Sequence, residues 1–382
     1  MRSILKNVID SWINFESGFA RQEKSDIKRL LIFRKDGLGD YIIFLPVLKH
    51  YREVFPNHEI SLVVSKIAQE LIPKIQGIDK FVILDNKRFS KNFLYRRRFI
   101  LDIVKHGYET VIYPVFSPEV IGDAIVSASR AKTKIGFDGD YSYTKKEKHS
   151  EKVYTKLIKV PENATTEFER NIFFIKSLGA SINEISFPTI KPERDDLDQA
   201  EAIIKENDLT KKRFCVIFPG AGQAYKVWPT NKYVEVINYL KQKEITPVIC
   251  GTKDDLSVIS SITKQLAGKD SFINLAGQTS IGSLLGLLSK SRFYFGSDTG
   301  ILHLAAAAGT PAICLMGGGH FKRFFPYGDL TKNLIIYNKE MKCLNDNWLC
   351  SKNLKADEPA PCIKGISVED AKEAIDNLLR II

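Results

Sequence analysis

The stretch RLLIFRKDGLGDYIIFLPVLKHY, residues 29–51, decides the fold of the first half of the chain. Residues 30–33 are a short apolar run typical of a buried strand, and residues 41–55 have the pattern of a helix. Gly37 and Gly39 lie between them and permit a tight turn. The stretch therefore predicts a strand, a turn and a helix, the first part of a βαβ unit.

Asp40 lies where this helix should begin, and two interpretations are open. An aspartate commonly caps a helix N-terminus and stabilises it by about 1 kcal/mol. Alternatively, Asp40 is a base directed into a ligand site. The glycines do not decide between them, because a lone GxG is weak evidence and the full GxGxxG dinucleotide fingerprint is absent.

The rest of the chain alternates short apolar runs with charged helical stretches, which predicts an α/β fold with parallel sheets. Ligands of such sheets bind at the carboxyl ends of the strands, so we expect the site in a cleft between two similar halves. The further predicted strands are residues 59–64, 81–84, 110–113, 214–218, 246–250, 272–275, 293–295 and 312–315.

A chain of 382 residues exceeds a comfortable single core, which predicts two domains. Residues 186–196 contain two prolines and a charge cluster, as an interdomain linker would. We therefore expect an N-terminal domain over residues 1–190, with an extension at 1–27, and a C-terminal domain over 191–382. The last helix is expected to pack back on the N-terminal domain.

Composition points to a soluble globular protein, with 44% hydrophobic and 26% charged residues. The sequence has no uncharged apolar run of about eighteen residues and no signal-peptide pattern, so we expect a cytoplasmic protein.

The net charge of +11 is uneven, since residues 1–190 hold 31 Lys and Arg against 23 Asp and Glu. Such charge is usually a solvated surface, and the alternative is an anionic partner such as a phosphorylated glycan or a lipid surface. Nucleic acid is disfavoured because no helix-turn-helix, zinc-finger or RNP pattern accompanies the charge.

Residues 2–15 have apolar side chains at helical spacing and predict an amphipathic helix. This helix either packs on its own domain or docks peripherally on the inner face of a membrane. The apolar positions are Ile4, Leu5, Val8, Ile9, Trp12 and Ile13.

A second motif, FPGAGQAYKVWP at residues 218–229, follows a predicted strand. Gly220 and Gly222 offer backbone N–H groups and Lys226 offers a cation, as a phosphate site requires. The motif is not a Walker A loop, and it could also be an ordinary turn with a packed Trp228.

A third motif, GSDTGILHLAAAAGTP at residues 296–311, places the start of a helix directly after Asp298, Thr299 and Gly300. The N–H groups and partial positive charge of its first turn suit a diphosphate. Alternatively, Asp298 or Thr299 is only a cap, and His303 is a core histidine.

The six cysteines fall into two groups. Cys215, Cys250 and Cys314 lie in apolar strand contexts and are expected to be buried thiols. Those of the tail, spaced C-x6-C-x11-C, make a poor structural zinc site because there are three and no CxxC pair. We therefore expect reduced thiols and no metal at Cys343, Cys350 and Cys362.

As an ordered set, GLGD at 37–40, PGAG with Lys226 and Trp228-Pro229, and DTG-x-x-H with the alanine-rich helix resemble glycosyltransferase family 9. This is the family of the ADP-heptose:lipopolysaccharide heptosyltransferases. Further matches are KIGFD at 134–138 and ERN at 169–171, followed by SLG at 177–179.

The resemblance implies a GT-B fold of two Rossmann-like domains, with the acceptor on the first and the nucleotide-sugar on the second. It implies an inverting, metal-independent transfer, most simply of heptose from ADP-heptose to an anionic glycolipid. A nucleotide-sugar 2-epimerase and a non-catalytic nucleotide- or glycan-binding protein are the alternatives. The implied roles are the base for Asp40, phosphate binding for Lys226, diphosphate binding for Asp298, Thr299, Gly300 and His303, and ribose binding for Asp254 or Asp255.

Overall fold

The computed structural model describes residues 18, 20–23, 25–140, 152–210, 213–266, 272–350 and 358–382. The predicted amphipathic helix at residues 2–15 lies outside them. The chain divides into two compact units, Met1–Ile185 and Ser186–Ile382. No helix in the described ranges is long and apolar enough to cross a membrane.

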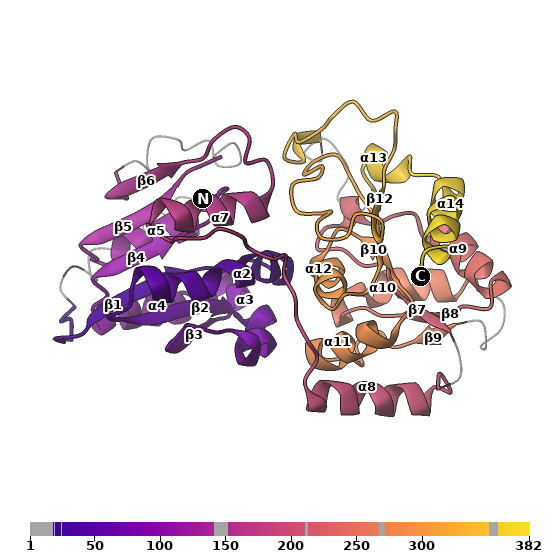
Figure 1. Cartoon of the computed structure of the whole chain (residues 1–382), viewed down its shortest axis with the longest axis horizontal. Helices are drawn as coiled ribbons and strands as arrows, with labels where there is room; N and C mark the ends of the chain where they lie inside the picture. Colours follow the sequence, from indigo (N-terminus) through magenta and orange to yellow (C-terminus); the bar gives the residue numbers. More distant parts are fainter. Residues whose placement is uncertain are drawn as a thin grey trace. The chain divides into compact units, whose positions relative to one another are not determined.

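The first unit is a six-stranded parallel sheet in the order β3-β2-β1-β4-β5-β6, wound with helices (Figure 1). Its strands are β1 Lys28–Phe33, β2 His58–Ser65, β3 Lys80–Leu84, β4 Thr110–Tyr113, β5 Thr133–Asp138 and β6 Lys156–Lys159. Its helices are α2 Leu38–Val54, η1 Lys66–Lys74, α3 Asn86–Lys91, α4 Phe93–His106, α5 Val120–Ala128 and α7 Glu167–Ser177.

The second unit repeats this order, since its sheet reads β9-β8-β7-β10-β11-β12 from one edge. Its strands are β7 Phe214–Phe218, β8 Thr246–Ile249, β9 Ile273–Asn274, β10 Tyr294–Ser297, β11 Ala312–Leu315 and β12 Asn333–Ile336. Its helices are α8 Arg194–Glu206, η2 Ala224–Lys226, α9 Thr230–Gln242, η3 Lys253–Asp255, α10 Leu256–Thr263, α11 Ile281–Lys290, α12 Gly300–Ala307, α13 Pro361–Lys364 and α14 Val368–Leu379.

The central strands are apolar on both faces because helices cover both sides of each sheet. Residues Leu30 to Phe33 of β1 are fully buried, and so is Val111 of β4, which pairs with Leu31. In the second unit β7 is buried along its whole length. The prediction of two doubly wound parallel sheets is therefore confirmed.

The predicted linker is too long at its C-terminal end. Residues 194–196 are not linker but begin α8, because Glu193 and Asp196 form a capping box there. Helix α14 packs within the second unit against α9 and β12 (Figure 1). Its apolar face, including Ala371, Ile375 and Leu378, joins the core of that unit.

Candidate active site

The predicted site residues follow the strands at which each sheet reverses its order. In the first unit β1 pairs with both β2 and β4, and Asp40 follows β1. In the second unit β7 pairs with both β8 and β10, so the segments that follow β7 and β10 leave neighbouring strands. These segments carry Lys226 and Asp298. The reversal point is where open α/β sheets bind ligands.

Asp40 lies in the first turn of α2 and is partly exposed. The N-cap residue of this helix is Gly37, which has no side chain to form a cap. The interpretation of Asp40 as the N-cap is therefore wrong, although its carboxylate still lies at the positive end of the helix dipole. Gly37 is exposed and Gly39 is buried, so the two glycines of the turn have different surroundings.

Sequence reasoning missed Arg34, a buried cation next to this turn. Its Nε donates to Asp36 Oδ2 at 2.5 Å, and its guanidinium lies over the Phe44 ring at 4.3 Å. Burial acts to lower the pKa of Arg34, but the charges of Asp36 and Asp40 outweigh burial and raise it. Asp40 therefore lies within the field of a fixed positive charge. The feature of the sequence that could have revealed Arg34 is its position at the end of a buried strand.

The ERN match on α7 also leads to Arg34. Nη1 of Arg34 donates to Oδ1 of the buried Asn171 at 3.3 Å, which joins residues 137 positions apart. Glu169 has a different role, because its carboxylate accepts from the N–H groups of Thr165 and Thr166 and caps α7. The motif thus combines a helix cap with a support for the Arg34 side chain.

Lys226 ends the short helix η2 and is held by aromatic and backbone contacts. Its Nζ lies 5.0 Å from the centre of the Trp348 ring, a cation–π geometry. Ser297, at the end of β10, donates from Oγ to the Lys226 carbonyl at 3.3 Å. The structure thus brings the second and third sequence motifs together at the ends of β7 and β10.

Asp298 and His303 form an ion-pair geometry at the start of α12. His303 Nε2 lies 3.7 Å from Asp298 Oδ1, and Nδ1 of the same buried ring is 3.2 Å from the Tyr327 hydroxyl. Burial acts to raise the pKa of Asp298, but the attraction of His303, Lys226 and His320 outweighs it and lowers the pKa. His303 is therefore both a core histidine and a partner of Asp298.

Thr299 is the N-cap residue of α12 and Gly300 is its first residue. The Thr299 side chain makes no cap hydrogen bond. The first N–H groups of a helix have no partner within the helix and carry partial positive charge. This terminus, beside the Lys226 cation, can accept an anion such as a diphosphate.

The two candidate ribose contacts differ. The carboxylate of Asp255 accepts from the N–H and hydroxyl of Thr252 at 2.8 and 2.7 Å, so this residue is a buried cap and its expected ribose role is disfavoured. A Cβ on Gly220 would lie 2.1 Å from Asp255 Oδ1, which explains the glycine there. Gly222 is exposed and has room for a side chain. Asp254 is exposed.

A cavity of about 450 Å³ lies beside Asp254 and the loop after β7. Ala221, Ala224 and Val227 line it from the segment after β7, and Asp254 and Val258 line it from η3 and α10. Trp228 also lines it, but the ring is fully buried and donates to the Ile366 carbonyl at 3.2 Å. Trp228 is therefore packed, as the alternative interpretation of this motif required.

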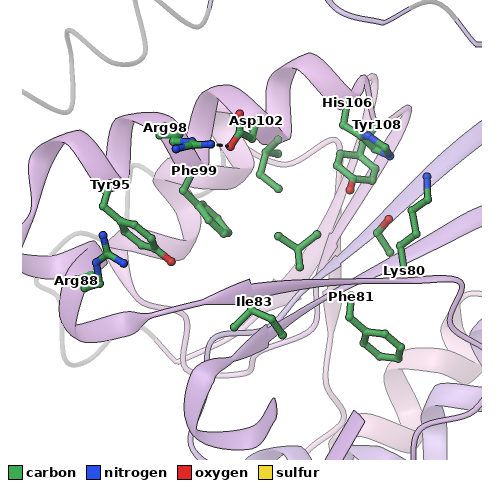
Figure 2. Close-up of a pocket in the computed structure, with 13 residues that line it drawn as sticks. Lys80, Phe81, Ile83, Arg88, Tyr95, Arg98, Phe99, Asp102, His106 and Tyr108 are labelled. Carbon is green, nitrogen blue, oxygen red and sulfur yellow. Dashed lines mark ion pairs between the residues drawn. The ribbon is translucent and has the colours of Figure 1, made fainter. Parts of the chain in front are cut away.

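A larger pocket, of about 580 Å³, lies in the first unit between α4 and β3 (Figure 2). Arg98 and Asp102 form an ion pair on the α4 side, while Phe81 and Ile83 belong to β3. None of the predicted site residues is among those that line it. This pocket is thus separate from the Asp40 turn.

Comparison with known proteins agrees with this architecture. The sequence profile described as Glycosyltransferase family 9 (heptosyltransferase) matches residues 96–352. The chain belongs to this family. It is therefore a glycosyltransferase with the GT-B fold. The family, the fold and the enzyme class predicted from the sequence are confirmed.

Individual family 9 proteins resemble the chain over most of its length. The lipopolysaccharide core heptosyltransferase OpsX of Haemophilus influenzae is 26% identical over 322 residues, which is 82% of this chain and 85% of OpsX. The glycosyltransferase family 9 structure from Veillonella parvula has a TM-score of 0.74 at 19% identity and covers 95% of this chain and 100% of its own. Escherichia coli heptosyltransferase WaaC with ADP-2-deoxy-2-fluoro heptose has a TM-score of 0.61 at 18% identity, covering 91% and 99%.

Proposed function

We propose that this family 9 glycosyltransferase transfers heptose from ADP-heptose to a lipopolysaccharide or lipooligosaccharide acceptor. The observation that carries the proposal is the convergence of Lys226 and the first turn of α12 at the adjoining ends of β7 and β10. A cation and a helix N-terminus suit a diphosphate. The similarity to OpsX and to WaaC with its ADP-sugar analogue supports the sugar and the nucleotide.

In this proposal Asp40 is the catalytic base. The acceptor hydroxyl oxygen attacks the anomeric carbon, and its proton passes to the Asp40 carboxylate. The bond from that carbon to the diphosphate breaks, and ADP leaves with the electron pair. The configuration at the anomeric carbon is inverted because attack and departure take place on opposite faces.

Departure of ADP requires stabilisation of negative charge on the diphosphate. Lys226 supplies a full positive charge and the N-terminus of α12 supplies N–H donors. Asp298 fixes His303 through their 3.7 Å contact. We propose that these groups suffice for the transfer step, so that no divalent ion is needed at the diphosphate.

We further propose an anionic glycolipid as acceptor and peripheral contact with the cytoplasmic face of the inner membrane. The support is the positive charge of residues 1–190 and the lipopolysaccharide named for OpsX. Each Lys or Arg near an anionic membrane contributes roughly 1 kcal/mol of attraction. Nucleic acid is not among the proposed partners.

The deciding experiment incubates the full chain with ADP-, UDP- and GDP-sugars, with and without heptose-deficient lipopolysaccharide. We expect ADP release from ADP-heptose only with the acceptor present, together with a mass increase of one heptose on the lipid. Nucleotide release with an altered free sugar and no acceptor would indicate a 2-epimerase. Nucleotide binding without turnover on any pair would indicate a non-catalytic binding protein.

A further inference from the structure

The tail cysteines converge with an aspartate that the cysteine spacing alone does not reveal. The ligand atoms of Cys343, Asp346 and Cys350 all lie within 4.8 Å of one another. The three residues are partly exposed and belong to the segment 343–350, here called the cysteine loop. Two thiols and a carboxylate at this separation could share one metal ion.

Cys362 lies near this group, although its sulfur is not among the three atoms that are mutually within 4.8 Å. Its sulfur accepts from the N–H of Gly318 at 3.4 Å. A Cβ on that same glycine would lie 2.1 Å from the Cys343 carbonyl oxygen, so the backbone of Gly318 is in contact with both cysteines.

We propose that Cys343, Asp346 and Cys350 bind one divalent transition metal ion, zinc or iron, with Cys362 as the fourth ligand after a movement of the loop. The ion fixes the cysteine loop and thereby holds Trp348 against Lys226. Thiolates favour zinc and iron over magnesium or calcium, and four such ligands complete a tetrahedral structural site. Ligand atoms around a tetrahedral ion are about 3.6 to 3.8 Å apart, given metal–sulfur and metal–oxygen distances near 2.3 and 2.1 Å. The ligand atoms of Cys343, Asp346 and Cys350 would therefore move together by about 1 Å at most.

The backbone of the cysteine loop supports a role for such a clamp. Asn345, Asn347 and Trp348 have positive φ angles of 56°, 53° and 59°. Non-glycine residues in this region cost of order 1 kcal/mol each and persist where the surroundings hold them. An ion bound on both sides of these residues, through Cys343 and Cys350, would hold the loop in this conformation.

The cysteine loop packs against the glycine run 317–319. The N–H groups of Asn345 and Asn347 donate to the carbonyls of Gly318 and Gly319 at 2.8 and 3.0 Å. A Cβ on Gly317 or Gly319 would lie 2.3 Å from the Trp348 ring. The ring is thus packed directly on this backbone.

Trp348 connects the loop to the donor side. Its ring lies 5.1 Å from that of Tyr225 and 5.0 Å from Lys226 Nζ. A loop released from its ion would therefore leave Lys226 without its aromatic support. This consequence for the donor rests on the proposed function, whereas ion binding itself does not.

The test begins with elemental analysis of the untagged full chain, expressed with added zinc and iron and purified without chelator. We expect one zinc or iron per chain, with loss of the ion in Cys350→Ser and reduced occupancy in Asp346→Asn. Cys250→Ala is the matched control, because this buried cysteine directly follows β8 and lies outside the cluster, and it should keep the ion. Metal-free wild type should bind one Co²⁺ with a thiolate charge-transfer band in the near ultraviolet, a readout that does not depend on folding of the variants.

The site is overturned if wild type carries no stoichiometric metal and gives no thiolate band with Co²⁺. A disulfide between tail cysteines in the purified chain, seen by mass spectrometry of unreduced peptides, also overturns it. The link to Lys226 is tested by ADP titration, in which metal-free wild type should bind about tenfold more weakly than the loaded chain. Equal affinities would overturn that link. Failure of the loaded chain to bind ADP at all would count against the proposed function and not against the ion.

Discussion

The Nε of Arg34 donates a hydrogen bond to Oδ2 of Asp36 over 2.5 Å. Both side chains are largely buried, with 3% and 14% of their surfaces exposed. A buried cation of this kind is costly unless its partners are in place. The Arg34–Asp36 pair therefore fixes the turn that contains Asp40. Its contribution can be measured by replacing each partner separately.

Arg34→Met should destabilise the chain by about 3 kcal/mol, because Asp36 would keep a buried charge without its partner. The double variant Arg34→Met with Asp36→Asn should recover much of this loss, as measured by urea unfolding. Activity should stay low in the double variant, because Asp40 still lacks its cationic neighbour. Equal recovery of stability and turnover would show that Arg34 has only a structural role.

Asp40→Asn should reduce turnover by about a hundredfold or more, the scale expected for loss of a general base. The amide keeps the shape of the side chain but does not accept a proton near pH 7. Asp195→Asn is the matched control, since Asp195 is exposed in the first turn of α8 and also loses a helix-dipole contact. Near-normal turnover of a folded Asp40→Asn enzyme would remove Asp40 from the mechanism.

Lys226→Ala should weaken ADP binding by about ten- to a hundredfold, since a charge-assisted hydrogen bond contributes about 1.5 to 3 kcal/mol. Calorimetric titration measures this, and Lys241→Ala, an exposed lysine of α9, should leave affinity unchanged. Turnover of wild type should also be the same with and without added Mg²⁺. A strict requirement for added Mg²⁺ would contradict the proposed role of Lys226 and α12.

Asp298→Asn should change the pH dependence of stability. The pKa of Asp298 is lowered in the folded chain, so its stabilising effect is present above its ordinary value of 3.8 and is lost as the pH falls through the lower native value. The difference in urea midpoint between wild type and variant should be constant above about pH 5 and shrink below it. A difference that is constant down to pH 3 would show that the carboxylate charge is not involved.

Gly220→Ala should destabilise the second unit by about 1 to 3 kcal/mol, because the new methyl group displaces the Asp255 carboxylate from its cap on η3. Gly222→Ala, where nothing lies within 4 Å of the added carbon, should fold like wild type. Thermal unfolding of the pair measures the difference. Similar melting temperatures would mean that Asp255 can move aside at little cost.

The sequence by itself determined the two sheets, because buried strands and tight turns are local patterns of apolar residues and glycines. Residues 30–33, 110–113 and 214–218 were all recognisable in this way. Strands β5, β6 and β12 were not predicted as strands. Strand β6 has only four residues, KLIK, with an exposed lysine at each end, and is too short to show a clear period.

The ordered motifs also determined the family, because each one is a short run of fixed spacing. Tertiary structure alone decided which side chains share an environment. Arg34 meets Asn171 across 137 positions, Gly220 excludes a side chain because Asp255 lies against it, and Asp346 lies beside Cys343 and Cys350. Spacing along the chain does not carry these contacts, since they depend on how the strands order within each sheet and on where the loops return.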